Sequence, residues 1–235
     1  MAEELYERTI NCPICNREFT TKKMKTSAIR VAKRDEDFCP YYEGENPLFY
    51  GVFVCVHCGY AALESHFSNK KSQEDKKRII DIITPRWNSR SYGEKRTLDE
   101  AIEVYKLALL CSNVLEEKSS VIGKICLRLS WFFRYKADEE ERKFIEFTIS
   151  SFEKAFTGER GNDDEYDEIA RLYLLGELNR RLEKYSEAIM WFDKVLSHPH
   201  INKKRHIKLK ARDQWSAARE QYKAYKSTWA IPQEV

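Results

Sequence analysis

The sequence lacks the features that carry a protein into or across a membrane. No apolar run approaches the roughly 20 residues that a membrane-spanning helix requires. Residues 1–8 contain neither the basic start nor the apolar stretch of an export signal. The first absence excludes a membrane-spanning helix of ordinary length, and the second leads us to expect a cytoplasmic protein without a membrane partner.

Familiar catalytic motifs are missing as well. The chain has no glycine-rich phosphate loop, no G-x-S-x-G turn and no H-E-x-x-H pair. These motifs would supply a phosphate-binding backbone, an exposed nucleophile or a metal ion with an open coordination position. We therefore expect that the protein is not an enzyme.

Neither sign of charge dominates the chain. It has 41 basic and 38 acidic residues, so its net charge of +3 gives no reason by itself to expect a nucleic-acid or membrane partner. Charged residues make up 34% and aromatic residues 13% of the chain, proportions typical of a soluble globular protein. Any electrostatic argument must therefore come from local clusters.

Two cysteine pairs share the spacing C-x₂-C, namely Cys12 with Cys15 and Cys55 with Cys58. Four thiolates in this arrangement suit one tetrahedral zinc ion. A site with four cysteine ligands is closed, because no coordination position remains for water or substrate. We therefore expect one structural zinc ion, and the sequence leaves open an iron centre with the same ligands.

The residues around these pairs favour a metal site over a redox dithiol. Asn16 and Gly59 directly follow the second cysteine of each pair, and both residue types tolerate a left-handed backbone. A thioredoxin-like dithiol would instead need one pair at the start of a helix in a βαβ unit. His57 lies between two ligands, so we expect its ring to face solvent. In a reducing compartment the remaining cysteines are expected to be buried free thiols.

We expect an α+β fold in three segments. Residues 1–67 contain short β-type stretches and predict a small sheet in a zinc-ribbon-like β module. Residues 68–97 are polar and basic, and they predict a connector with one short helix. Residues 98–235 place apolar side chains at helical intervals, which predicts an all-α domain.

One part of the helical domain, residues 169–200, has the clearest repeat. Its Leu175-Gly176, Tyr185, Ala188, Phe192 and Pro199 recur at intervals that resemble the tetratricopeptide pattern. In that pattern small residues allow two antiparallel helices to approach closely. We therefore expect a tetratricopeptide-like helical stack of two to three repeats, closed by a final helix.

Three segments of the chain resemble those of a known family. They are residues 34–42 (RDEDFCPYY), 46–50 (NPLFY) and 54–61 (VCVHCGYA). With these segments the chain is similar, over nearly its whole length, to an uncharacterised bacterial family, domain-of-unknown-function family 2225. The resemblance implies a cytosolic protein with an N-terminal cysteine-rich module and a helical tail, and it implies no activity.

Charge is segregated near the cysteine pairs. Residues 8–34 hold eight basic residues and one acidic residue, whereas residues 35–64 hold six acidic residues and no lysine or arginine. Pairing between the two segments is one interpretation. The alternative is nucleic-acid binding, with Phe19 contacting a base. The basic side chains that would then bind the phosphates are Arg17, Lys22, Lys23, Lys25, Arg30, Lys33 and Arg34.

The acidic segment supports a second alternative, an enzyme. In this alternative a pocket would be lined by Asp35, Asp37, Cys39, Tyr41, Tyr42 and Asn46. Cys39, however, lies beside carboxylates, which disfavour its thiolate, and no adjacent histidine or lysine activates it. We therefore expect Cys39 to be a packed free thiol.

These observations together favour a binding protein. The leading hypothesis is a non-enzymatic adaptor in which zinc stabilises the N-terminal module and the helical-repeat surface binds a protein partner, because stacked helical hairpins expose long grooves. Nucleic-acid binding and an enzyme remain the two alternatives.

Overall fold

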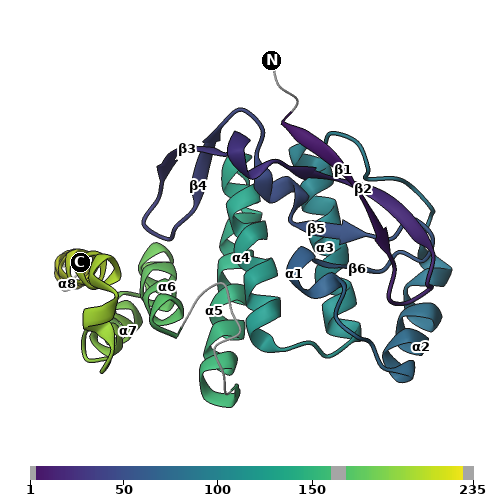
Figure 1. The fold of residues 1–235 in the computed structure, drawn as a ribbon. Coiled ribbons are helices and arrows are strands. Elements are labelled where there is room, and N and C mark those ends of the chain that lie inside the picture. The colour runs from purple at the N-terminus through teal and green to yellow at the C-terminus, as the bar shows by residue number, and fades with distance from the viewer. Residues whose placement is uncertain (1–3, 160–167, 230–235) are drawn as a thin grey trace, which may run out of the picture. The chain divides into compact units, whose positions relative to one another are not determined.

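The structure of the chain is a computed structural model that describes residues 4–159 and 168–229. It contains two compact units. The first unit comprises Met1–Arg34 and Cys39–Thr148, and the second comprises Asp35–Phe38 and Ile149–Val235. Figure 1 shows the helices and strands of both units.

Strands occur in the first unit as three antiparallel pairs. The pairs are β1 (Leu5–Asn11) with β2 (Glu18–Met24), β3 (Arg30–Arg34) with β4 (Pro40–Glu43), and β5 (Val52–Val54) with β6 (Ala61–Leu63). The sequence predicted one small sheet, whereas the described residues form three separate two-stranded sheets. Two short 3₁₀ helices, Thr26–Ala28 and Pro47–Tyr50, interrupt the expected strands, the second beginning at a proline whose fixed φ suits a helical start.

Helices follow the strands in the first unit. They are α1 (Glu64–Phe67), α2 (Gln73–Ile82), α3 (Leu98–Val114), α4 (Ser119–Tyr135) and the first part of α5 (Glu140–Gly158). Ser72 and Thr97 each begin a helix with a capping box, in which the hydroxyl accepts from the third helical N–H and an acidic side chain accepts in return. The connector helix expected from the sequence is therefore present as α2.

One hydrophobic core joins β1, β2, β5 and β6 to the helices of the first unit. Helix α3 packs on β5 and β6 and beside α4 (Figure 1). The core includes Val52, Phe53, Ala61, Ala101, Tyr105, Cys111, Ile125 and Phe132, all less than 3% exposed. The units therefore divide the chain at other positions than the three segments expected from the sequence, because the apolar face of α3 is buried against the β5–β6 strands.

Arg96 fixes the connector to this core. Its side chain is buried, and its guanidinium donates to the carbonyl oxygens of Tyr92 at 3.0 Å, Phe49 at 2.9 Å and Val52 at 2.8 Å. Burial lowers the pKa of Arg96 to about 10. A buried cation is tolerated here because backbone carbonyls replace its water.

Helices make up the second unit. After the last turns of α5 it contains α6 (Glu168–Arg181), α7 (Tyr185–Leu196), a 3₁₀ turn (Ile201–Lys203) and α8 (Arg205–Trp229). Helix α7 packs against both α6 and α8. A Cβ atom on Gly176 would lie 2.6 Å from the ring of Phe192, so the close approach predicted at this glycine is confirmed. Among the described residues, no helix combines the length and apolarity needed to cross a bilayer.

Candidate metal centre

The turns of two hairpins carry the cysteine pairs. Cys12 and Cys15 lie between β1 and β2, and Cys55 and Cys58 lie between β5 and β6. We call residues 12–17 the first knuckle and residues 55–60 the second knuckle. Each knuckle connects one strand to its antiparallel partner. Strand pairing therefore holds the two ends of each turn together.

Both knuckles have the same backbone hydrogen bonds. In the first, Cys12 N–H donates to Arg17 O and Asn16 N–H donates to Cys12 O, both at 3.0 Å. In the second, Cys55 N–H donates to Tyr60 O and Gly59 N–H donates to Cys55 O, both at 2.9 Å. The repetition shows that the shared C-x₂-C spacing produces the same turn twice.

The residue after each pair has the left-handed backbone expected from the sequence. Asn16 has φ 58° and Gly59 has φ 75°. The two positions differ in their surroundings, since Asn16 is exposed and Gly59 is buried. A Cβ on Gly59 would lie 2.7 Å from the indole of Trp87, so glycine is required there for space as well as for conformation.

The four sulfur atoms gather into one cluster. Cys12 Sγ lies 3.6 Å from Cys58 Sγ, and Cys15 Sγ lies 3.6 Å from Cys55 Sγ. All four lie within 4.8 Å of one another. A tetrahedral zinc ion with bonds of 2.3 Å would separate its sulfur ligands by about 3.8 Å. The cluster is therefore compatible with a metal site of four thiolates.

Burial makes this a closed site. Cys12, Cys55 and Cys58 are at most 3% exposed, and only Cys15 is half-buried. Hydrogen bonding within the cluster lowers the pKa of Cys55, with Cys12 as the largest cause, and raises the pKa of Cys12 and of Cys58. A thiolate on one sulfur thus disfavours thiolates on its neighbours, so four thiolates together would require a bound cation. Four sulfurs would complete a tetrahedral shell, so such a site has a structural and not a catalytic character.

Connector residues that the sequence did not single out support the second knuckle. Trp87 Nε1–H and the Ser89 hydroxyl each donate to Val56 O at 2.9 Å, and the Thr84 hydroxyl donates to Cys58 O at 3.0 Å. His57 is exposed, and its Nε2 lies 3.0 Å from Glu18 O at the start of β2. The second knuckle is thus hydrogen-bonded on several sides.

A family comparison covers this site and most of the helices. Residues 5–218 match a family described as uncharacterized protein conserved in bacteria, DUF2225. The chain belongs to this family. No curated protein and no solved structure matches the chain. The resemblance noted in the sequence is confirmed, and since the family description names no activity, the function must be argued from the geometry.

The basic residues proposed for nucleic-acid binding have different surroundings. Five of them are exposed, namely Arg17, Lys25, Arg30, Lys33 and Arg34. Lys22 and Lys23 are half-buried, and they pair with Glu7 at 3.9 Å and with Glu64, respectively. Phe19 is 6% exposed and packs edge-on against Phe67, so the expectation that its ring would contact a base is wrong.

The residues proposed to line an enzyme pocket fall into two units. Asp35 and Asp37 belong to the second unit, whereas Cys39, Tyr41, Tyr42 and Asn46 belong to the first. Asn46 accepts from Leu48 N–H at 2.9 Å and caps a 3₁₀ helix. Cys39 is fully buried with its sulfur 3.7 Å from the Tyr135 hydroxyl, which agrees with a packed free thiol.

Two cavities of the first unit are lined by other residues. One, of about 290 Å³, is lined by Glu4, Leu5, Lys22, Glu45, Glu94 and Lys95. The other, of about 310 Å³, is lined by Asn69, Lys70, Lys71, Asp75 and residues 115–118. Neither contains a cysteine or a histidine. Burial also raises the pKa of Cys111 and of Cys126 to about 12, as expected for core thiols.

Proposed function

We propose that this protein is a non-enzymatic cytoplasmic adaptor, with a structural zinc ion in its first unit and a partner-binding surface on a tetratricopeptide-like helical stack. The observation that carries the proposal is that the first unit contains a closed cluster of four sulfurs, whereas the second unit is helical. A saturated metal stabilises a fold and offers no position for substrate. The helical unit is then the part available for recognition.

The zinc ion would hold the two knuckles together. Apparent binding energies of structural zinc sites are about 10–16 kcal/mol, which is comparable with the stability of a whole domain. The strand pairs that carry the knuckles are separate two-stranded sheets, and isolated hairpins are marginal in water. A metal between them therefore supports the fold and leaves recognition to another surface.

The helical stack offers such a surface. Its α6–α7 hairpin packs closely at Gly176, as the small-residue positions of tetratricopeptide repeats do, and α8 covers α7. Large apolar side chains remain exposed on the stack, with Met190 at 44% and Leu209 at 51%. Exposed apolar groups on stacked helices are typical of protein-binding surfaces.

The test is capture of a partner from the bacterial cell with the full chain, followed by crosslinking to locate the contact. We expect crosslinks on the second unit, and we expect Met190→Glu with Leu209→Glu to abolish capture. Ile80→Glu is the matched control, since Ile80 is 46% exposed on α2 of the first unit. No specific partner, together with turnover of a small molecule by the purified chain, would refute the adaptor.

Exposed basic residues support nucleic-acid binding as a second candidate function. Every residue of β3 is exposed, including Arg30, Lys33 and Arg34. If these side chains neutralise phosphates, affinity for a nucleic acid falls steeply with salt, and replacing all three with alanine reduces the slope by about 1 for each lost contact. Affinity that is absent, or that stays constant from low to moderate salt, contradicts this candidate.

A further inference from the structure

The hairpin tip, residues 35–38, groups with helices that lie far from it in the sequence. It joins β3 to β4 through a turn in which Phe38 N–H donates to Asp35 O at 3.0 Å. These four residues belong to the second unit together with α6, α7 and α8. The helical unit therefore already holds a short acidic segment that ends in an aromatic residue.

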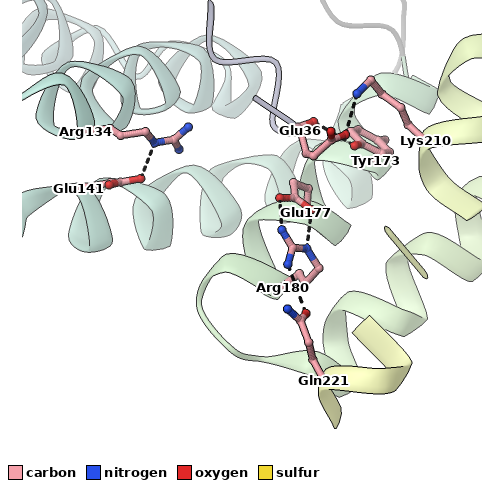
Figure 2. Close-up of polar contacts among 8 residues, drawn as sticks. All are labelled: Glu36, Arg134, Glu141, Tyr173, Glu177, Arg180, Lys210 and Gln221. Atoms are coloured by element: carbon pink, nitrogen blue, oxygen red, sulfur yellow. Dashed lines mark hydrogen bonds and ion pairs between the residues drawn. The ribbon is translucent and has the colours of Figure 1, made fainter. Parts of the chain in front are cut away.

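Three contacts hold the hairpin tip on α6 and α8, and Figure 2 shows the two that involve Glu36. The Tyr173 hydroxyl of α6 donates to the backbone carbonyl of Glu36 at 2.9 Å. Lys210 of α8 donates to the Glu36 carboxylate at 2.6 Å. The Phe38 ring stacks on the Tyr173 ring, with centroids 5.1 Å apart and planes at 28°. Backbone, charge and aromatic ring are thus each recognised.

Hydrogen bonds within α6 and between α6 and α8 adjoin this site. Tyr173, Glu177 and Arg180 are spaced along one face of α6. Arg180 donates to both carboxylate oxygens of Glu177, at 2.8 and 2.7 Å, and to Gln221 Oε1 of α8 at 3.2 Å (Figure 2). A bidentate pair of this kind fixes the geometry of both side chains. The hydrogen bond from Arg180 to Gln221 therefore ties α6 to α8 next to the site.

The binding of the hairpin tip, in contrast, is weakened by backbone strain and by exposure of its ion pair to solvent. Phe38 has φ 66°, a left-handed conformation that is a clear outlier for a bulky residue. The side chains of the Lys210–Glu36 pair are 38% and 42% exposed, so water and salt weaken it. These features suit a ligand that can be exchanged.

We propose that the α6–α8 site around Tyr173 and Lys210 is a binding site for an acidic turn followed by an aromatic residue, and that the hairpin tip occupies it as an internal ligand which a partner protein's segment of the same chemistry replaces. This inference rests on the proposed function and specifies its partner. The Tyr173 hydroxyl would donate to a backbone carbonyl of the ligand, and its ring would stack on the aromatic side chain. Lys210 would pair with the carboxylate of the ligand.

The experiment uses the full chain carrying Glu36→Ser and Phe38→Ser, which frees the site. The probe is a labelled peptide of residues 34–41 with Cys39→Ser, and binding is measured by fluorescence polarisation. We expect this variant to bind the peptide at least tenfold more tightly than the unmodified chain, because a tethered tip competes at an effective concentration of about 1 mM. Equal affinity for both proteins overturns the proposal.

Matched variants separate the site from general stickiness. The same peptide with Phe38→Ser should bind at least fivefold more weakly, and adding Tyr173→Phe and Lys210→Glu to the freed chain should abolish binding. The control is Val31→Ser in the unmodified chain, since Val31 is an exposed apolar residue of β3 outside the hairpin tip. This control should leave peptide affinity unchanged.

Amide hydrogen exchange of the unmodified chain tests the same proposal and does not depend on whether a variant folds. Saturating peptide should displace the hairpin tip and accelerate amide hydrogen exchange at Phe38 at least threefold, because the turn that protects this amide is released. Unchanged exchange at millimolar peptide overturns the proposal. So does concentration-dependent dimerisation that Phe38→Ser removes, since a second copy would then be the occupant.

The outcomes separate this inference from the adaptor. If the freed chain binds the peptide, but no cellular partner is captured and the purified chain turns over a small molecule, the adaptor is refuted and the peptide-binding site is retained. If a captured partner crosslinks to other helices and the peptide does not bind, the adaptor hypothesis is retained and the proposed peptide-binding site is refuted.

Discussion

The two knuckles have the same spacing, turn and hydrogen bonds, but they are built into the first unit to different degrees. The first ends at exposed Asn16 and includes the half-buried Cys15, whereas the second is buried from Cys58 to Tyr60. Trp87 covers Gly59 and donates to Val56 O. The comparison indicates that the core positions the second knuckle, while the first would depend more on a metal ion held by both.

The largest effect should come from removing the metal, by chelation or with Cys55→Ser. Loss of a four-thiolate site removes a contribution of about 10 kcal/mol or more, so the first unit should lose most of its stability. Exchange of amide hydrogens should increase more at residues 12–17 than at residues 55–60, because the connector donates hydrogen bonds to the second knuckle. Metal analysis and hydrogen exchange check this, and equal exposure of both knuckles would contradict the comparison.

The second largest effect is expected from alanine at the two left-handed positions, where the loss of stability should differ between the knuckles. Gly59→Ala adds a Cβ 2.7 Å from Trp87 to a left-handed backbone, and we expect a loss of about 2–4 kcal/mol in the free energy of unfolding. Asn16→Ala has the conformational cost alone, about 1 kcal/mol. Urea titration of both variants with metal bound measures the difference, and equal losses would show that the Trp87 contact does not matter.

A smaller effect is expected for Trp87→Phe, which keeps an aromatic ring beside Gly59 and removes the hydrogen bond to Val56 O. Val56 O keeps its hydrogen bond from the Ser89 hydroxyl, so the free energy of unfolding should fall by less than about 1 kcal/mol. Metal content should stay at one ion per chain. The double variant with Ser89→Ala supplies the control, since the two losses should reinforce each other on the shared carbonyl.

The smallest effect is expected for His57→Ala. The ring is exposed and makes a 3.0 Å contact with Glu18 O, outside the sulfur cluster. We expect a change within about 0.5 kcal/mol and an unchanged metal content. A variant that loses its metal would show that His57 takes part in coordination after all.

Local features were predictable from the sequence because they depend on near neighbours. The C-x₂-C spacing and the residue types at 16 and 59 predicted both turns. The small residue at Gly176 likewise predicted close helix packing. The turns depend on the backbone conformation of a few consecutive residues. The close helix packing depends on the absence of a side chain at one position.

Features that combine distant segments were not predictable. Phe19 lies among basic residues in the sequence, which suggested an exposed ring. In the structure, however, its ring is buried in the core and packs on Phe67. Acidic residues 35 and 37 were grouped with Cys39, although they belong with the helices of the second unit. Arg96 and Trp87 carried no signal at all, because their roles consist of donating to backbone carbonyls roughly 30 to 50 residues earlier.

By itself, the sequence determined the ligand set of the candidate metal centre, the two identical turns that present it and the helical character of the C-terminal part. Only the tertiary structure decided that α3 shares a core with β5 and β6, that the connector supports the second knuckle, and that the hairpin tip lies on α6 and α8. The physical reason is that turn geometry and metal-ligand spacing are properties of a few consecutive residues. Burial and hydrogen bonding between distant segments depend instead on which apolar faces meet.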